Sequence, residues 1–219
     1  MFDSPHIERD EAPHPQATSL VLKRLPPRCS TSVLLEVLDI IAARYDYVHL
    51  PLDHRTNKNM SMAFVNFVDH EEACVAFRRL SRPNDFPHAF APSTKAVWGA
   101  IHGLGPNLAH FVVRYGPAAL DPPCAPLVFL NCRCVPRTQT LLRDFVTTEM
   151  LEVAATFLQS QTSTVSPLGT LGAVSRGEAR ASTGSRSEMA RQSMSLSEIA
   201  AELTGIPSYS RDGHVVYQL

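Results

Sequence analysis

The stretch NMSMAFVNF, residues 59–67, decides which fold class we expect for this chain. Residues two apart in a β-strand share one face of the sheet. One such set is wholly apolar and suits a buried core: Ala63, Val65 and Phe67. The other set then faces away from that core: Met62, Phe64 and Asn66. An aromatic ring on a solvated sheet face is unfavourable unless something covers it, so Phe64 marks a candidate binding surface.

The segments around this stretch predict the remaining elements of a small α+β domain. Alternating apolar residues predict strands at 19–25, 45–53, 62–68 and 95–103, and 3.6-residue periodicity predicts helices at 31–45 and 70–80. Ser30 and Asp69 are suited to cap the two helices. The order is β-α-β-β-α-β, which is the ferredoxin-like arrangement with a four-stranded antiparallel sheet.

The rest of the chain predicts a short extension and a long polar tail. We expect a third helix from Pro106 to Gly116, a short strand at 127–130 and one or two amphipathic helices at 138–161. The composition of 162–197 favours disorder, and 195–205 could form a brief helix. The expected domain organisation is a disordered segment at 1–16, a folded domain at 17–118, an extension with helix at 119–161 and a largely disordered tail at 162–219.

The charge balance permits a polyanionic partner without demanding one. The formal net charge of the whole chain is −1, while residues 17–118 carry 11 basic and 8 acidic side chains. The N-terminus lacks the features of a secretory signal, and no apolar run approaches the length of a membrane span. Five cysteines without an export signal favour a reducing compartment. We therefore expect an intracellular protein of the nucleus or cytoplasm, with no membrane partner.

The sequence gives little reason to expect catalysis or a bound metal. Cys132 and Cys134 form a single C-x-C pair, whereas a tetrahedral metal site needs four ligands. Cys29 follows Arg28 just before a helix, an arrangement that could lower a thiol pKa, yet no acid–base partner is evident. No phosphate-binding glycine loop and no carboxylate cluster occurs in the sequence. We expect no cofactor, no metal and no enzymatic activity.

Residues 17–115 resemble the RNA-recognition motif family, and within it the Mei-two-like group. The resemblance rests on four blocks in the family's order: LVLKRLPPRCSTSVLLEVLD, YDYVHLPLD, SMAFVNFVDHEEA and WGAIHG followed by a helix. The family's eight-residue signature is a basic residue, Gly, an aromatic, Gly or Ala, Phe, Val, any residue and an aromatic. Residues 60–67 match it from Ala63 onward and depart from it at the first three places.

This resemblance implies single-stranded RNA binding on the open sheet face, in post-transcriptional regulation. Phe64 corresponds to the family's base-stacking aromatic, while Val21 and Met62 replace its other two stacking residues. The candidate RNA-binding residues are Val21, Lys23, Arg24, Tyr47, His49, Lys58, Met62, Phe64, Asn66, Trp98 and His102. Because two stacking positions are changed, a protein-interaction domain that retains the fold is the alternative. The extension after Ala118 could then cover the sheet or hold a protein partner.

Overall fold

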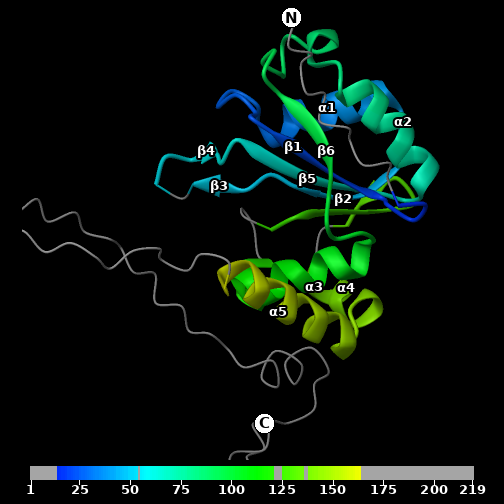
Figure 1. Cartoon of the computed structure of the whole chain (residues 1–219), viewed down its shortest axis with the longest axis vertical. Coiled ribbons are helices and arrows are strands. Elements are labelled where there is room, and N and C mark those ends of the chain that lie inside the picture. Colours follow the sequence, from blue (N-terminus) through cyan, green and yellow to red (C-terminus); the bar gives the residue numbers. More distant parts are fainter. Residues whose placement is uncertain (1–13, 54, 121–124, 136–137, 164–219) are drawn as a thin grey trace, which may run out of the picture.

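The computed structural model describes residues 14–53, 55–120, 125–135 and 138–163, which form three layers (Figure 1). Helices α1 (Thr31–Ile41) and α2 (His70–Leu80) cover one face of a β-sheet. Helices α3 (Leu104–Tyr115), α4 (Thr138–Phe145) and α5 (Thr148–Ser163) lie on the other face. The expectations for 1–13, for the polar tail beyond 163 and for a helix at 195–205 fall outside the described residues.

The sheet contains the four expected strands and continues beyond them. Its order is β6-β1-β5-β2-β7-β8, and every pairing is antiparallel. The strand bounds are β1 Ser19–Lys23, β2 Tyr45–His49, β5 Met62–Phe67, β6 Lys95–Trp98, β7 Leu127–Leu130 and β8 Arg133–Cys134. The hairpin strands β3 (Leu52–Asp53) and β4 (Lys58–Asn59) pair separately. The α+β ferredoxin-like expectation is confirmed, with β7 added at the edge of β2.

Both expected helix caps are present. The Ser30 hydroxyl accepts a hydrogen bond from the Val33 N–H, and the Asp69 carboxylate accepts one from the Glu72 N–H at 2.9 Å. The Glu72 carboxylate binds the Arg44 guanidinium at 2.7 Å. Short 3₁₀ turns at Pro83–Asp85 and Pro117–Leu120 connect the longer elements.

The first core lies between the sheet and the helices α1 and α2. The apolar set of β5 belongs to it, because Ala63, Val65 and Phe67 are each at most 1% exposed. Leu20 and Leu22 of β1 lie in the same core. The period-two reading of residues 62–67 is therefore confirmed for the core face.

Trp98 lies on the core face of the sheet, so the prediction that it faces the open side was wrong. In the β1–β6 register Trp98 pairs with Leu20, and Val97 pairs with Val21, so Trp98 shares the core face. Its indole stacks on Phe77 of α2 with ring centroids 5.2 Å apart. Ala96, Val97 and Trp98 are all apolar, so alternation alone does not fix the phase of this strand.

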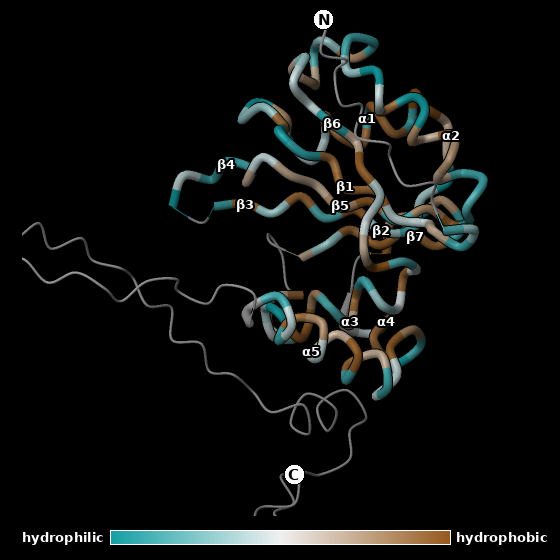
Figure 2. Tube along the Cα trace, viewed as in Figure 1, coloured by the Kyte–Doolittle hydropathy of each residue, from teal (hydrophilic) through white to brown (hydrophobic). Residues whose placement is uncertain are grey.

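A second core lies on the opposite face, over β2 and β7. Tyr47 and Val128 meet the α3 residues Leu108, Phe111 and Val112, and α4 and α5 pack behind them. Figure 2 shows apolar residues along α3 and α5, and apolar side chains of α3, α4 and α5 pack with Tyr47 and Val128 in this core. Residues 127–135 and 138–163 thus form part of the same packed body as the ferredoxin-like unit. Within the described ranges, no helix is long and apolar enough to cross a membrane.

Candidate functional site

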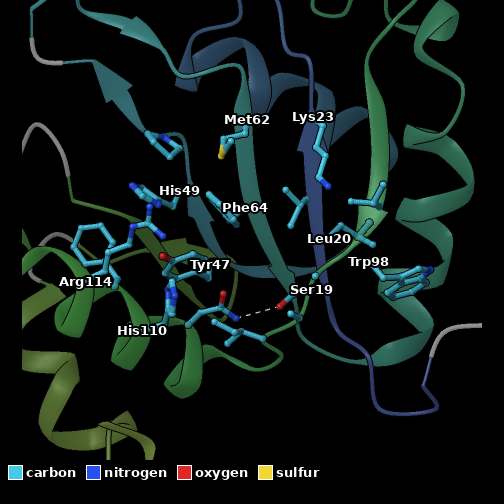
Figure 3. A pocket seen from close by; sticks show the side chains of 18 of the residues that line it. Ser19, Leu20, Lys23, Tyr47, His49, Met62, Phe64, Trp98, His110 and Arg114 are labelled. Atoms are coloured by element: carbon cyan, nitrogen blue, oxygen red, sulfur yellow. Dashed lines mark hydrogen bonds between the residues drawn. The ribbon is translucent and has the colours of Figure 1, made fainter. Parts of the chain in front are cut away.

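A pocket of about 450 Å³ lies where α3 meets the uncovered part of the sheet (Figure 3). Strands β1, β5 and β6 supply its floor, and the apolar floor residues are Val21, Met62, Phe64 and Val97. Phe64 pairs directly with Val21 in the β1–β5 register. Three residues predicted to face the open side, Val21, Met62 and Phe64, are thus brought together here. On β6, Val97 faces the open side next to Val21, where Trp98 was predicted to lie.

Two predicted binding residues on β2 lie on the open face but under α3. Tyr47 is 3% exposed and His49 is 7% exposed. The His49 ring stacks on Phe64 at 6.0 Å and meets Phe111 of α3 edge-on at 4.9 Å. Burial lowers the pKa of His49 to about 4, so this ring is neutral at physiological pH. Both rings support the pocket from behind, and a base cannot lie flat on either one without moving α3.

Asn66 also has a structural role where RNA contact was expected. Its side-chain oxygen accepts hydrogen bonds from the hydroxyls of Thr18 and Ser19 and from the Gly103 N–H. Its amide nitrogen donates to Asp46 at 2.7 Å. The side chain is 1% exposed and its polar atoms are engaged, so Asn66 fixes the start of α3 against β5.

The remaining predicted residues differ in how near they lie to the pocket. Lys23 is exposed and lines it, with its Cα opposite those of Met62 and Lys95. Arg24 and Lys58 are exposed but do not line it. The His102 Nδ1 accepts hydrogen bonds from the backbone N–H groups of Thr18 and Ser19, outside the pocket. Of the predicted phosphate-binding cations, only Lys23 is therefore placed at the pocket.

Helix α3 supplies a wall that sequence reasoning did not identify. Its residues His110, Phe111, Arg114 and Tyr115 line the pocket. Arg114 lies over the Tyr115 ring, 5.5 Å from its centroid. His110 and Arg114 are four residues apart, so they share one face of the helix. That spacing is visible in the sequence, but the direction in which this face points depends on how α3 packs.

One polar atom of this wall lacks a hydrogen bond. The His110 Nε2 is buried and has no hydrogen-bond partner within the part of the chain that the structure describes. Burial, with a smaller effect of the Arg114 charge, lowers the pKa of His110 to about 4. The pocket lining contains two permanent cations, Lys23 and Arg114, and no described aspartate or glutamate. An apolar floor with a purely cationic rim suits a flat, anionic ligand.

Catalytic or metal chemistry gains no support from the described residues. Burial raises the pKa of the Cys29 thiol to about 11, opposite to the lowered value that its neighbour Arg28 had suggested. Desolvation outweighs the arginine charge at this site. No group of three or more histidine, cysteine, aspartate or glutamate side chains in the described ranges is placed to hold a metal ion.

The fold and the pocket together define a class of protein. A ferredoxin-like sheet with an aromatic residue at the centre of its open face is the architecture of RNA-recognition domains. Residues 17–88 match the family model described as RNA recognition motif 2. Residues 17–88 thus carry an RNA recognition motif 2 domain, and the chain is distantly similar to MEI2-like proteins.

The similar curated proteins are much longer than this chain. Protein MEI2-like 4 of Arabidopsis thaliana is 24% identical over 113 residues, which is 51% of this chain and 12% of that protein. Protein MEI2-like 3 of Arabidopsis thaliana is 25% identical over 129 residues, covering 58% of this chain and 16% of that protein. The match to the first of these relatives thus spans about an eighth of its length.

Similar solved structures include a domain described as the Rna15 RRM with bound RNA (GU). It is 19% identical, with a TM-score of 0.34, and the match covers 42% of this chain and 95% of that one. RNA recognition domains 1 and 2 of Sex-lethal from Drosophila melanogaster are 15% identical, with a TM-score of 0.31 and coverage of 42% and 54%.

Proposed function

We propose that this protein binds single-stranded RNA on the part of the sheet formed by β1, β5 and β6. The observation that carries the proposal is the pocket itself, with Phe64 on its floor and Lys23 and Arg114 as its permanent cations. Bases splayed out of a single strand stack on aromatic rings, while lysine and arginine bind the phosphates. The role would be post-transcriptional regulation inside the cell, in the nucleus or the cytoplasm.

We expect this floor to give a modest affinity for RNA. Stacking on a ring contributes about 1–3 kcal/mol per base, and Phe64 is the aromatic side chain on the floor. Val21 and Met62 offer apolar contact in place of two further rings, and Met62 is 38% exposed. A methionine can adapt its shape to a base, so these substitutions weaken stacking without closing the surface.

A protein-interaction domain is the second candidate, because the β2 half of the sheet is already covered. Tyr47 and His49 are buried under α3, and β7 occupies the free edge of β2. A domain that had lost RNA binding could present the same apolar pocket to a peptide. Binding measurements with RNA separate the two functions.

The test is a titration of the full chain into a labelled pool of short single-stranded RNAs at two salt concentrations. Each phosphate contact gives a slope of about −0.7 in a plot of log affinity against log salt. Phe64→Ala should weaken binding by about 1 kcal/mol or more, because the stacking ring is lost.

Phe77→Leu is the matched control, since Phe77 of α2 packs against the core and does not line the pocket. It removes a phenylalanine ring on the other side of the sheet and should leave RNA affinity unchanged in folded protein. Absence of salt-dependent RNA binding by the wild-type chain would overturn the proposal and favour the protein-interaction function. Equal losses in both variants would show that the open face does not hold the RNA.

A further inference from the structure

The wall of the pocket contains two polar side chains, His110 and Arg114, that are available to bind a ligand. His110 and Arg114 project from the same face of α3, on the same side of the pocket (Figure 3). Neither forms an ion pair with another described residue. Both lie beside a floor that already suits a stacked base.

His110 is the more unusual of the two. A buried polar atom that lacks a hydrogen bond lowers stability, so such atoms are rare in folded proteins unless a ligand or water completes them. The imidazole is neutral at physiological pH, because burial lowers its pKa to about 4. A neutral imidazole nitrogen can form one directional hydrogen bond with the edge of a base.

Arg114 is placed differently, at the exposed mouth of the pocket. Its contact with the Tyr115 ring holds the guanidinium near the surface of α3 without neutralising it. Figure 3 shows Phe64 between Arg114 and Lys23, so the two cations flank the ring. A nucleotide stacked on Phe64 would have its backbone within the field of both charges.

We propose that α3 reads the nucleotide stacked on Phe64, with His110 Nε2 bonding the base edge and Arg114 binding its phosphate. The inference rests on the RNA-binding function proposed above and assigns two binding residues outside the four-stranded sheet. Phe157 of α5 contacts the imidazole with ring centroids 5.9 Å apart. Phe157 also lines the pocket, so we expect its side chain to move when a base approaches Nε2.

Substitutions of the two residues should change different properties of RNA binding. A base contact determines sequence preference, whereas a phosphate contact contributes equally for every sequence and adds to the salt dependence. The probes are labelled homopolymeric oligonucleotides of adenine, cytosine, guanine and uracil, titrated with the full chain. The variants are His110→Leu, His110→Gln and Arg114→Gln, with Arg78→Gln on the opposite helix layer as the charge control.

We expect the wild-type chain to prefer one base by about tenfold, and His110→Leu to reduce that preference to less than about threefold. His110→Gln keeps a group that can donate and accept, so it should retain part of the preference. Phe157→Ala should retain all of it, since it opens the path to Nε2. The preference should also be the same at pH 6 and pH 8, because His110 stays neutral across that range.

Arg114→Gln should weaken binding of all four oligonucleotides by a similar factor and reduce the magnitude of the salt slope by about 0.7. Arg78→Gln should change neither quantity. Binding without base preference in the wild type, or an unchanged preference in folded His110→Leu, would overturn the role of His110. An unchanged slope in Arg114→Gln would overturn the role of Arg114. Failure of the wild-type chain to bind any RNA would instead refute the proposed function itself.

Discussion

The side-chain oxygen of Asn66, in the middle of the sheet, accepts a hydrogen bond from the Gly103 N–H at 2.9 Å. Gly103 directly precedes α3 and has a positive φ of 90°, a conformation that glycine adopts without strain. This bond joins the central strand to the start of the helix that forms the pocket wall. The position of α3 over β2 therefore depends on a residue that sequence reasoning assigned to RNA contact.

Asn66→Ala should lower the free energy of unfolding by about 3–5 kcal/mol. The change leaves the hydroxyls of Thr18 and Ser19, the Gly103 N–H and the Asp46 carboxylate without their shared partner in a buried site. Urea denaturation followed by circular dichroism measures the loss. Asn107→Ala, which removes two bonds at the edge of the same network, should cost only about 1 kcal/mol. Equal stabilities for both variants would contradict this account.

His110→Leu should raise the free energy of unfolding by about 1 kcal/mol at pH 7, because a buried nitrogen without a partner is replaced by a methyl group. The advantage should grow as the pH falls from 6.5 to 4. In that window the unfolded wild-type chain binds a proton at His110 that the folded chain, with a pKa of about 4, does not. Thermal unfolding at pH 7 and pH 5 tests this, and a smaller difference at pH 5 would refute it.

Asp46→Asn should stabilise the protein at neutral pH and not under acid conditions. Burial raises the pKa of Asp46 from 3.8 to about 6, although Asn66 donates a hydrogen bond to the carboxylate. The folded state therefore favours the protonated form, and stability is lost as the pH rises from about 4 to 6. The variant should gain ~1–3 kcal/mol at pH 7.5 and little at pH 4. Denaturation midpoints that shift equally at both pH values would argue against this cause.

Gly105→Ala should destabilise the packing of α4 and α5 on α3. Alanine normally stabilises a helix by about 1 kcal/mol relative to glycine. At this position, however, a Cβ would collide with the Phe145 carbonyl oxygen and press on the Met150 side chain. A lower melting temperature, with faster hydrogen exchange in 138–163 than in β1 and β5, is expected. A higher melting temperature would show that α4 and α5 can move away from α3 without loss of stability.

The sequence predicted an element correctly wherever its local pattern fitted only one kind of structure. Residues 62–67 alternate cleanly between core and open face, and Ser30 and Asp69 cap their helices as their side chains allow. The strand at 127–130 and the helices after it were also expected, and they form as β7, α4 and α5. In each case the residues that form the pattern lie within one short segment, although the strands and helices that these elements pack against are distant in the chain.

Only the tertiary structure decided which of these surfaces remain open. The face of Trp98 was set by its register with Leu20, which lies 78 positions away and which an all-apolar segment cannot specify. Helix α3 crosses the sheet and thereby buries Tyr47 and His49. The same crossing places His110 and Arg114 at the pocket. That crossing is fixed by contacts between residues distant in the chain, such as Asn66 with Gly103, and periodicity carries no information about them. The sequence by itself determined the elements and their order, whereas long-range packing determined the site.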